Sequence, residues 1–281
     1  MKRGYRVRVL DNLSLGRREW TPPDAEFIQG DVRDLETCRE AVRGCVGVFH
    51  LAAMSRSAAS LDNVEICTSN NVIGTQNVLT AAREANVRKV VYSGSSTAYG
   101  NRPAPHTEDL RPEFLNFYGL SKYIGEEYCL MFDRLYGLPG VVLRYFNVYG
   151  PRLSGTGPYA LVLSIFLEQY RRGVPLTIHG SGEQRRDFVH VRDVARANVL
   201  AFERDVRGTV LNVGSGTSVS IKEIATEIST QHIFEPRRAC DAEITLADLN
   251  RVRRALGWQP EVSLQEGLRE LLETVEQPVG A

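Results

Sequence analysis

The sequence predicts a doubly wound α/β fold, in which helices cover both faces of a parallel sheet. Between residues 5 and 213, short strand-like apolar runs alternate with longer segments of helical spacing, which is the pattern of βαβ units. The run at residues 46–53 is almost continuously apolar, as expected for a strand that is buried on both faces. With 281 residues, 43% of them hydrophobic, the chain is long enough to bury a substantial core around such a sheet.

The expected strands lie at residues 5–10, 26–30, 46–53, 87–93, 141–147 and 209–213. The expected helices among them lie at residues 71–86, 118–136 and 191–202. A segment rich in Gly, Ser and Pro at residues 151–158 predicts a loop. Beyond this loop we expect a smaller region, interleaved with the last units of the sheet. Its helices are expected at residues 161–172, 221–229 and 264–276, and its short strand at residues 176–179.

Composition argues against several classes of function. Lys plus Arg and Asp plus Glu both number 34, so the chain carries no net charge that would favour nucleic acid or a membrane surface. No apolar run is long enough to span a bilayer. The cysteines form no Cys-x-x-Cys pair and their number is odd, which predicts a reducing, cytoplasmic setting without a metal site. They are Cys38, Cys45, Cys67, Cys129 and Cys240.

The start of the chain lacks a feature that such folds usually have. A doubly wound nucleotide-binding domain opens with a strand, a glycine-rich turn and a helix, but no G-x-G-x-x-G or G-x-x-G-x-x-G pattern occurs here. Instead, Gly4 has the position of a helix C-cap directly before the first expected strand. We therefore expect the first, central strand and its glycine turn to be missing, and the natural gene product to begin further upstream.

Tyr118 and Lys122 are four residues apart in an expected helix, which places them on one face, one turn from each other. A tyrosine that acts as a base at neutral pH needs its pKa to fall from about 10 by roughly three units, or about 4 kcal/mol. A neighbouring lysine cation favours the phenolate in this way. Because the spacing is common by chance, a pair of surface residues is the alternative for this motif taken alone.

A run of hydroxyl side chains at residues 93–97 follows an expected strand. The carboxyl ends of strands are where open α/β sheets bind their ligands. A hydroxyl at this edge can hold a substrate oxygen while the tyrosine moves the proton. An ordinary polar turn is the alternative interpretation of these residues.

With the segment at residues 143–152, Leu-Arg-Tyr-Phe-Asn-Val-Tyr-Gly-Pro-Arg, these motifs resemble the extended short-chain dehydrogenase/reductase family of NAD-dependent epimerases and dehydratases. UDP-glucose 4-epimerase-like enzymes are the nearest match. Further segments that agree lie at residues 9–13, 30–32, 50–53, 70–75, 186–193 and 256–260. The resemblance covers nearly the whole chain. It implies a Rossmann-like NAD-binding domain at residues 1–150 and 187–214, and a nucleotide-sugar-binding region at residues 151–186 and 215–281.

The resemblance also implies roles for individual residues. Tyr118 is the acid/base, Lys122 is its partner and reaches the nicotinamide ribose, and Ser95 holds the substrate oxygen, with Ser96 as the competing assignment. Asp11 would accept hydrogen bonds from the adenosine ribose and repel a 2′-phosphate, which favours NAD over NADP. The other expected cofactor contacts are Asn12, Asp31, Val32, Leu51, Ala52, Ala53, Asn70 and Tyr145.

For the substrate, the resemblance implies a nucleotide-diphosphate sugar, with a UDP-sugar as the first expectation. Arg186 suits a diphosphate because its planar guanidinium pairs with two phosphate oxygens, although a surface ion pair is the alternative. The other expected contacts are Asn147, Arg238 and Asp241. This region departs from the family, because the chain is short between residues 228 and 235 and Cys240 stands where a glycine is usual. A homodimer through the helices at 71–86 and 118–136 is also implied.

The implied reaction is epimerisation at C4 of the sugar, with Tyr118 taking the hydroxyl proton and NAD accepting and returning the hydride. Within the family, a 4,6-dehydratase, a decarboxylase or a reductase remains an alternative. Dehydratases that resemble this chain have an Asp-Glu pair after the catalytic threonine, whereas residues 96–98 here are Ser-Thr-Ala. An alternative of another class is a non-catalytic, truncated nucleotide-binding relative. The missing glycine turn favours it, and the intact Tyr118 and Lys122 argue against it.

Overall fold

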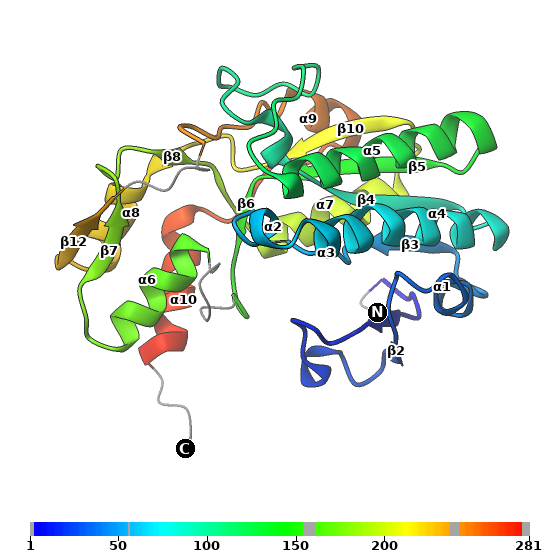
Figure 1. The fold of residues 1–281 in the computed structure, drawn as a ribbon, viewed down its shortest axis with the longest axis horizontal. Coiled ribbons are helices and arrows are strands. Elements are labelled where there is room, and N and C mark those ends of the chain that lie inside the picture. The colour runs from blue at the N-terminus through cyan, green and yellow to red at the C-terminus, as the bar shows by residue number, and fades with distance from the viewer. Residues whose placement is uncertain (1–2, 56, 154–160, 237–241, 277–281) are drawn as a thin grey trace.

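The computed structural model describes residues 3–55, 57–153, 161–236 and 242–276. A four-stranded parallel sheet with helices on both faces forms its centre, which confirms the predicted doubly wound α/β class (Figure 1). All neighbouring strands in this sheet are parallel. The strand order is β10 (Thr209–Val213), β5 (Gly140–Tyr145), β4 (Lys89–Ser95) and β3 (Gly47–His50).

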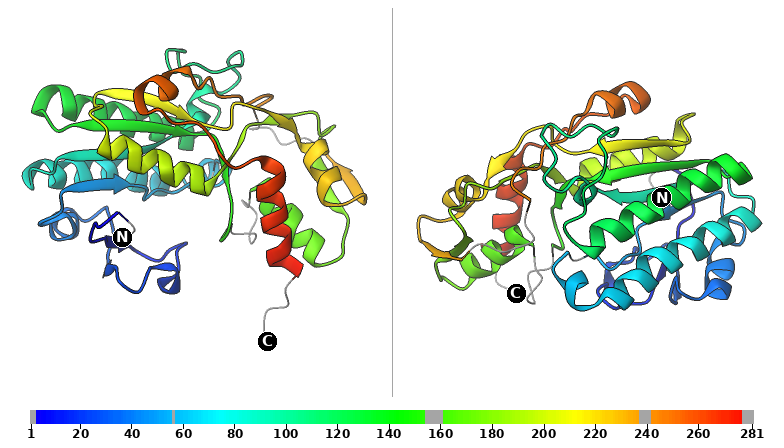
Figure 2. Two further views of the ribbon diagram at one scale, coloured as in Figure 1. Left: turned by 180° about the vertical axis from the view of Figure 1, so that it is seen from behind. Right: turned by 45° about the horizontal axis from the view of Figure 1, so that its top comes forward.

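Successive side chains of the central strands pack into two different cores, one on each face of the sheet. On one face, Val90, Tyr92 and Val142 pack against α4 (Gly74–Glu84) and α5 (Phe117–Tyr136). On the other, Val91 and Leu143 pack with the side chains of α7 (Val191–Glu203) and α9 (Asn250–Leu256). The period-two alternation of a strand therefore places consecutive apolar residues in different cores. The view from behind shows α7 crossing its face of the sheet (Figure 2).

The N-terminal segment forms a separate unit of two parallel strands, β1 (Arg8–Asp11) and β2 (Glu26–Gln29), with the short η1 (Arg18–Trp20) between them. The unit continues into α1 (Leu35–Val42), which packs against α4. β1 ends its own two-stranded sheet and β3 ends the central sheet, and the two strands are not hydrogen-bonded to each other. The expectation that a central strand is missing between them stays a prediction.

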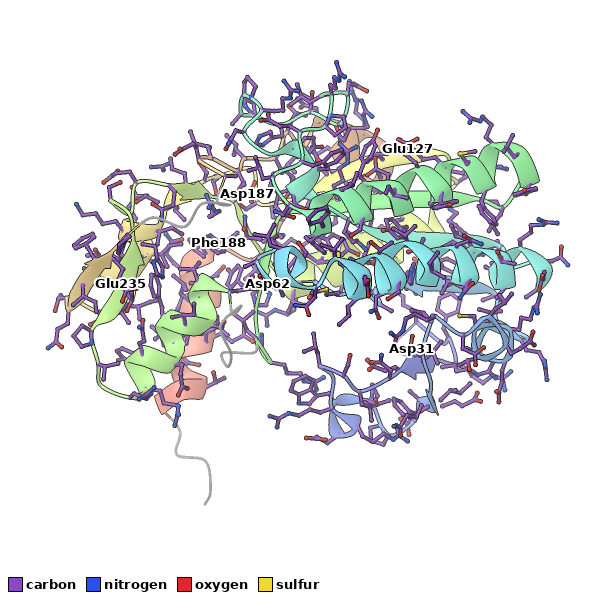
Figure 3. The ribbon with its side chains drawn as sticks, viewed as in Figure 1. Asp31, Asp62, Glu127, Asp187, Phe188 and Glu235 are labelled. Carbon is purple, nitrogen blue, oxygen red and sulfur yellow. The ribbon has the colours of Figure 1, made fainter. Side chains whose placement is uncertain are left out.

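A smaller region surrounds a further, separate core beyond the carboxyl ends of the central strands. Short strand pairs join it to the sheet: β6 (Asn147–Tyr149) with β9 (Phe188–His190), and β8 (Arg185–Arg186) with β11 (Val219–Ser220). Asp187 and Phe188 lie at this junction (Figure 3). The remaining elements are α6 (Val162–Arg171), β7 (Leu176–His179), α8 (Ile221–Ile228), β12 (His232–Glu235) and α10 (Leu264–Glu276).

Several boundaries differ from those predicted. β3 ends at His50, and residues 51–53 leave the sheet to line a cavity. The expected helix at 71–86 begins inside a π-helical turn, η2 (Ser69–Ile73), and the expected strand at 141–147 divides into β5 and β6. Four of the described α-helices were not predicted. They are α1, α2 (Ala59–Asp62), α3 (Val64–Thr68) and α9.

No described helix is long and apolar enough to cross a membrane. Within the same residues, no group of three or more His, Cys, Asp or Glu side chains has the arrangement of a metal site.

The packing of α5 on β4 predicts a cost for Gly125→Ala. A Cβ at residue 125 would lie 2.2 Å from the hydroxyl of Tyr92, which donates a hydrogen bond of 3.1 Å to the Lys122 carbonyl. We expect Gly125→Ala to lower the free energy of unfolding by about 1–3 kcal/mol in urea titrations. Arg134→Ala, at an exposed position of the same helix, should stay within about 0.5 kcal/mol of the parent. Equal stability of the two variants would contradict this packing.

Candidate active site

The end of β4 and the first turn of α5 meet because a glycine allows it. β4 ends at Ser95, and the chain turns through η3 (Ser96–Tyr99). The side chain of Asn116 caps α5 by accepting a 2.9 Å hydrogen bond from the Gly119 N–H. A Cβ at residue 119 would lie 3.0 Å from the Thr97 carbonyl oxygen, so the helix touches the serine turn where it lacks a side chain. This contact brings the predicted tyrosine and serine segments together.

Ser95 is held by its own turn. Its hydroxyl lies 2.8 Å from the Thr97 hydroxyl and accepts a 3.3 Å hydrogen bond from the Thr97 N–H, which makes Ser95 the N-cap of η3. The residue is buried, whereas Ser96 is half-buried. The orientation of the Ser95 hydroxyl is therefore fixed before any substrate binds.

Tyr118 and Lys122 occupy the first two turns of α5. The Tyr118 N–H donates a 3.0 Å hydrogen bond to the hydroxyl of Ser60 on α2, which anchors the start of the helix. The Lys122 ammonium is buried and lies 4.3 Å from the centre of the Tyr92 ring. Burial lowers the pKa of Lys122 to about 7, an effect that the nearby thiol of Cys67 opposes.

Asn71 connects α5 to the segment that follows β3. Its side-chain oxygen accepts a 2.7 Å hydrogen bond from the Met54 N–H, and its amide donates to the Ser121 hydroxyl at 2.9 Å. The Asn71 carbonyl accepts a 2.6 Å bond from Thr75, whose hydroxyl is 2.9 Å from a ring nitrogen of His50. Because the Thr75 hydroxyl donates its proton to the Asn71 carbonyl, the ring nitrogen of His50 donates a hydrogen bond to the Thr75 oxygen. Burial and the Lys122 charge lower the pKa of His50 to about 3.

An ion pair that we did not predict from the sequence lies behind these residues. Arg144 on β5 binds both oxygens of Glu126 on α5, at 2.9 and 2.6 Å, and both side chains are almost fully buried. Arg144 also donates to the Tyr99 hydroxyl at 2.8 Å, and Tyr99 donates to Asn212 on β10 at 2.7 Å. Local spacing carries no signal of this pair, because Arg144 lies 18 residues from Glu126 along the chain.

Most of the expected cofactor residues line one cavity of about 1180 Å³ between the β1–β2 unit and β3. Asp11 and Asn12 end β1, and the Asn12 side chain donates a 2.8 Å hydrogen bond to Asp31. Hydrogen bonds from Arg33 hold the pKa of Asp31 well below its usual range. The expected residues that line the cavity are Asp11, Asn12, Val32, Leu51, Ala52, Ala53 and Asn70.

Tyr145 is another expected cofactor contact, and that role stays a prediction. It does not line this cavity. Its hydroxyl donates a 2.9 Å hydrogen bond to Asn198 and lies 3.1 Å from the hydroxyl of Ser93. These bonds join β5, α7 and β4, so the side chain of Tyr145 is part of the interior.

Two of the expected substrate residues lie in short strands: Asn147 begins β6 and Arg186 ends β8. The Asn147 amide donates to the Asp187 carbonyl at 2.8 Å and to the Thr245 hydroxyl at 3.0 Å. Arg186 is half-buried and donates a 3.0 Å hydrogen bond to the Arg185 carbonyl. Arg238 and Asp241 lie outside the described residues.

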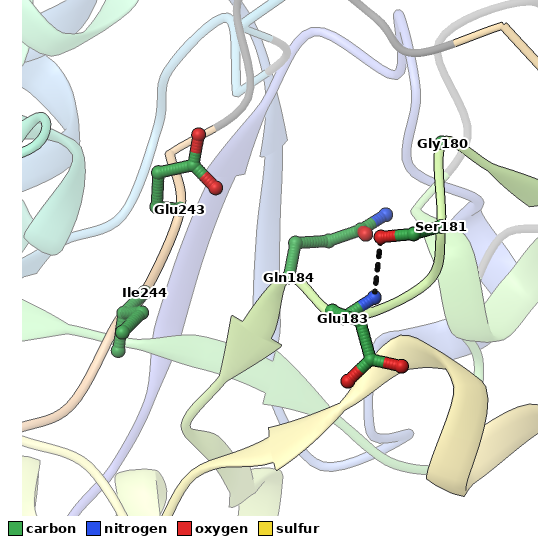
Figure 4. A pocket seen from close by; sticks show the side chains of 6 residues that line it. All are labelled: Gly180, Ser181, Glu183, Gln184, Glu243 and Ile244. Carbon is green, nitrogen blue, oxygen red and sulfur yellow. Dashed lines mark hydrogen bonds between the residues drawn. The ribbon is translucent and has the colours of Figure 1, made fainter.

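A hollow of about 200 Å³ lies near these residues (Figure 4). It is lined by Gly180, Ser181, Glu183, Gln184, Glu243 and Ile244. None of these residues was predicted to bind the substrate or the cofactor. The hollow is also much smaller than the cavity beside β3, so we do not assign the chemistry to it.

Comparison with known proteins decides the family. Residues 1–214 match the model of the NAD dependent epimerase/dehydratase family. The chain belongs to this family. The predicted family, NAD dependence and enzymatic class are thereby confirmed.

Named members of the family align with almost the whole chain. A putative UDP-glucose 4-epimerase of Methanocaldococcus jannaschii is 34% identical over 97% of this chain and 91% of its own. The structure of UDP-glucose 4-epimerase with UDP-glucose from Thermotoga maritima gives a TM-score of 0.93 at 35% identity, covering 97% of this chain and 91% of that one. The Thermus thermophilus UDP-glucose 4-epimerase complex with NAD gives 0.91 at 32% identity, covering 99% and 93%.

The buried lysine predicts a pH dependence of stability for the cofactor-free enzyme. The pKa of Lys122 is about 7 in the folded chain and about 10.4 when unfolded, so between these values the unfolded chain binds more protons. The free energy of unfolding of the parent, relative to Lys122→Met, should therefore rise from pH 7 to pH 9. Urea titrations at several pH values measure this difference. Lys222→Met removes an exposed lysine and should give a constant difference; a constant difference for Lys122→Met as well would contradict the burial.

Proposed function

We propose that this enzyme is a nucleotide-sugar 4-epimerase that uses NAD, with a UDP-hexose as its substrate. The observation that carries the proposal is the contact of α5 with the serine turn at Gly119, which brings the Tyr118 segment against that of Ser95. The buried Lys122 lies one helical turn from Tyr118. Relatives named UDP-glucose 4-epimerase at 34% and 36% identity support the choice of reaction.

In this mechanism Tyr118 removes the proton from the sugar 4-hydroxyl and later returns it. Lys122, when protonated, favours the tyrosinate through its positive charge in a site from which water is excluded. Ser95 holds the sugar oxygen by a hydrogen bond, and the Thr97 contact keeps the serine oriented. Bound NAD supplies a hydride acceptor and donor, so the reaction has no net redox change.

Several residues of the large cavity are suited to hold NAD. Asp11 ends β1 with a carboxylate that can accept from ribose hydroxyls, which favours NAD over its 2′-phosphorylated form. Leu51, Ala52 and Ala53 give the cavity an apolar wall beyond the end of β3. Asn12 and Asp31 are joined by a hydrogen bond beside them, and together these residues fit the adenosine half of the dinucleotide.

We propose that the smaller region, residues 151–186 and 215–281, binds the sugar nucleotide. Residues 1–150 and 187–214 would bind NAD. Asn147 and Arg186 would contact the sugar nucleotide, together with Arg238 and Asp241. Support comes from the β6–β9 and β8–β11 pairs, which place Asn147 and Arg186 at the junction of the two regions. The buried thiols of Cys38, Cys67 and Cys129 suit the cytoplasmic location that we also propose.

A decarboxylase is the second candidate. The UDP-N-acetyl-alpha-D-glucosaminuronate decarboxylase of Bacillus cytotoxicus is 30% identical over 97% of this chain, so identity alone separates the two reactions weakly. A 4,6-dehydratase is disfavoured because residues 96–98 supply no carboxylate to remove a carbon-bound proton. Product analysis with UDP-glucose and with UDP-glucuronate distinguishes epimerisation from decarboxylation.

We also propose that two chains pair through α4 and α5. Apolar side chains of α5 are exposed in the single chain, and such patches mark contact surfaces. They include Leu120, Met131 and Leu135, which are 36%, 40% and 59% exposed. A twofold pairing of this surface would cover them, since a C₂ dimer is the commonest oligomer.

Replacing the acid/base tests the mechanism. Tyr118→Phe should lower the interconversion of UDP-galactose and UDP-glucose by about 10²–10⁴-fold in a preparation that shows the activity, because it removes the one phenolic proton that the step needs. NAD binding, followed by calorimetry, should change little. Tyr123→Phe, also on α5, should keep normal turnover. Near-normal turnover of Tyr118→Phe would show that the site is misassigned.

The proposed dimer predicts a mass change on substitution. The parent chain should scatter light as a dimer at micromolar concentration, and Leu120→Glu combined with Met131→Glu should give a monomer, because two charges would then be buried at the contact. Leu15→Glu alters a residue that is 65% exposed in the β1–β2 unit and should remain dimeric. A monomeric parent would refute the dimer and leave the mechanism untouched.

A further inference from the structure

Asp187 is a fully buried carboxylate at the junction of the two regions (Figure 3). One of its oxygens accepts hydrogen bonds from the Ser215 N–H and the Ser215 hydroxyl, at 2.6 and 2.7 Å. The other oxygen accepts from the N–H groups of Gly216 and Ala247, at 3.1 and 3.0 Å. All four partners are donors, so they suit an ionised carboxylate. No step of the proposed reaction uses this side chain.

The backbone before Asp187 begins a parallel ladder with the segment at residues 243–247. The Arg185 N–H donates to the Glu243 carbonyl at 2.9 Å, and the Thr245 N–H donates to the Arg185 carbonyl at 3.0 Å. In a regular ladder, the next bonds would run from the Asp187 N–H to the Thr245 carbonyl and from the Ala247 N–H to the Asp187 carbonyl. The second of these bonds would occupy the Asp187 carbonyl.

Side chains replace both of those bonds. The Asp187 N–H donates to the Thr245 hydroxyl at 3.1 Å, and the Ala247 N–H donates to the Asp187 carboxylate. The Asp187 carbonyl is thereby left for Asn147 on β6, whose backbone N–H and side-chain amide donate to it at 3.0 and 2.8 Å. The carboxylate therefore allows the chain to change partners at this residue, from the 243–247 segment to β6, while the Ala247 N–H keeps an acceptor.

This change of partner brings two expected substrate residues together. Arg186 immediately precedes Asp187, and Asn147 is hydrogen-bonded to the Asp187 carbonyl, although the two residues belong to different strands. The turn at residues 214–216 approaches the same carboxylate closely, because a Cβ at Gly214 would lie 2.7 Å from one of its oxygens. One side chain thus holds three segments at the place where Asn147 and Arg186 meet.

We propose that Asp187 is a positioning residue for the binding of a nucleotide-diphosphate sugar. It acts through its neighbours: the carboxylate holds the 214–216 turn and Ala247, and the carbonyl that it leaves available fixes Asn147 beside Arg186. The guanidinium of Arg186 is suited to pair with a diphosphate when it is held in this way. The inference rests on the proposed function, which makes Asn147 and Arg186 contacts of the sugar nucleotide.

Asp187→Asn tests the carboxylate with almost no change in side-chain volume. Asparagine keeps one acceptor oxygen, so its NH₂ group would face two of the four donors and leave them unpaired. We expect the dissociation constant for UDP-glucose, measured by isothermal titration calorimetry on the 281-residue chain, to rise by about tenfold or more. An unchanged dissociation constant overturns the proposal.

A second buried aspartate provides the matched control. Asp193 on α7 accepts 3.0 Å hydrogen bonds from the N–H groups of Glu261 and Val262, which precede α10. Asp193→Asn should lower the free energy of unfolding in urea, as Asp187→Asn should, but leave the dissociation constant for UDP-glucose within about twofold of the parent. Equal losses of affinity in the two variants would indicate a general loss of structure and overturn the positioning role.

Kinetics separate positioning from chemistry. In a preparation that interconverts UDP-galactose and UDP-glucose, Asp187→Asn should raise KM by about tenfold and change kcat by less than about threefold. The reason is that the four partners of the carboxylate lie outside β4 and α5, which carry Ser95 and Tyr118. A fall in kcat at unchanged KM would contradict the assignment.

A milder variant serves if Asp187→Asn does not fold. Ser215→Ala removes one of the four donors and keeps the carboxylate with its three N–H partners. The dissociation constant for UDP-glucose should then rise by about threefold, because one hydrogen bond of the clasp is lost. No change in this variant overturns the proposal.

Binding and turnover are separate measurements, so the two proposals can fail separately. Weaker binding of UDP-glucose by Asp187→Asn, in a parent that binds it without epimerising it, would reject the 4-epimerase and support the positioning role. Interconversion by the parent, with equal binding by both chains, would support the 4-epimerase and reject the positioning role. A parent chain that does not bind UDP-glucose overturns both.

Discussion

The buried ion pair between Arg144 and Glu126 is the interaction on which the rest of the site depends. It joins the middle of α5 to β5 with two charge-assisted hydrogen bonds, and both side chains are almost fully buried. Loss of one partner would leave an isolated charge in the interior, at a cost of about 3–5 kcal/mol. The helix therefore has one favourable register on the sheet, and that register sets where Tyr118 and Lys122 lie.

Tyr92 then acts at the same place in three ways. Its ring forms the surface over which the Lys122 ammonium lies, its hydroxyl bonds to the Lys122 carbonyl, and it fills the space that Gly125 leaves open. The same contacts thus have two effects: they fix α5 on the sheet, and they remove water from the Lys122 ammonium. That explains why the pKa of Lys122 falls to about 7 at the point where Tyr92 packs against the helix.

The bounds of several helices and strands could be predicted from local patterns, whereas pairings between residues far apart in the sequence could not. Residues 176–179 and 264–276 form a strand and a helix with the predicted bounds, and the expected helix at 118–136 begins one residue early, at Phe117. Periodicity and capping are encoded within each segment, so they could be recognised. The interior role of Tyr145 and the pairing of Arg144 with Glu126 depend on partners brought close only by folding.

The two halves of the proposed site have unequal support. The Ser95 turn and α5 stand on a hydrogen-bonded sheet from β10 to β3, so the acid/base geometry is formed by the central sheet itself. Asp11 stands on β1, outside that sheet, and the unit that contains β1 packs on the rest of the molecule through a small apolar cluster where α1 meets α4. Its members include Val32, Cys38, Val42, Val78 and Ala81. The position of Asp11 relative to Tyr118 therefore depends on the contact of α1 with α4, supplemented by the Tyr5–Phe202 ring contact and the hydrogen bond from Arg152 to the Trp20 carbonyl. Cofactor affinity should respond to changes in the α1–α4 contact before the proton chemistry does.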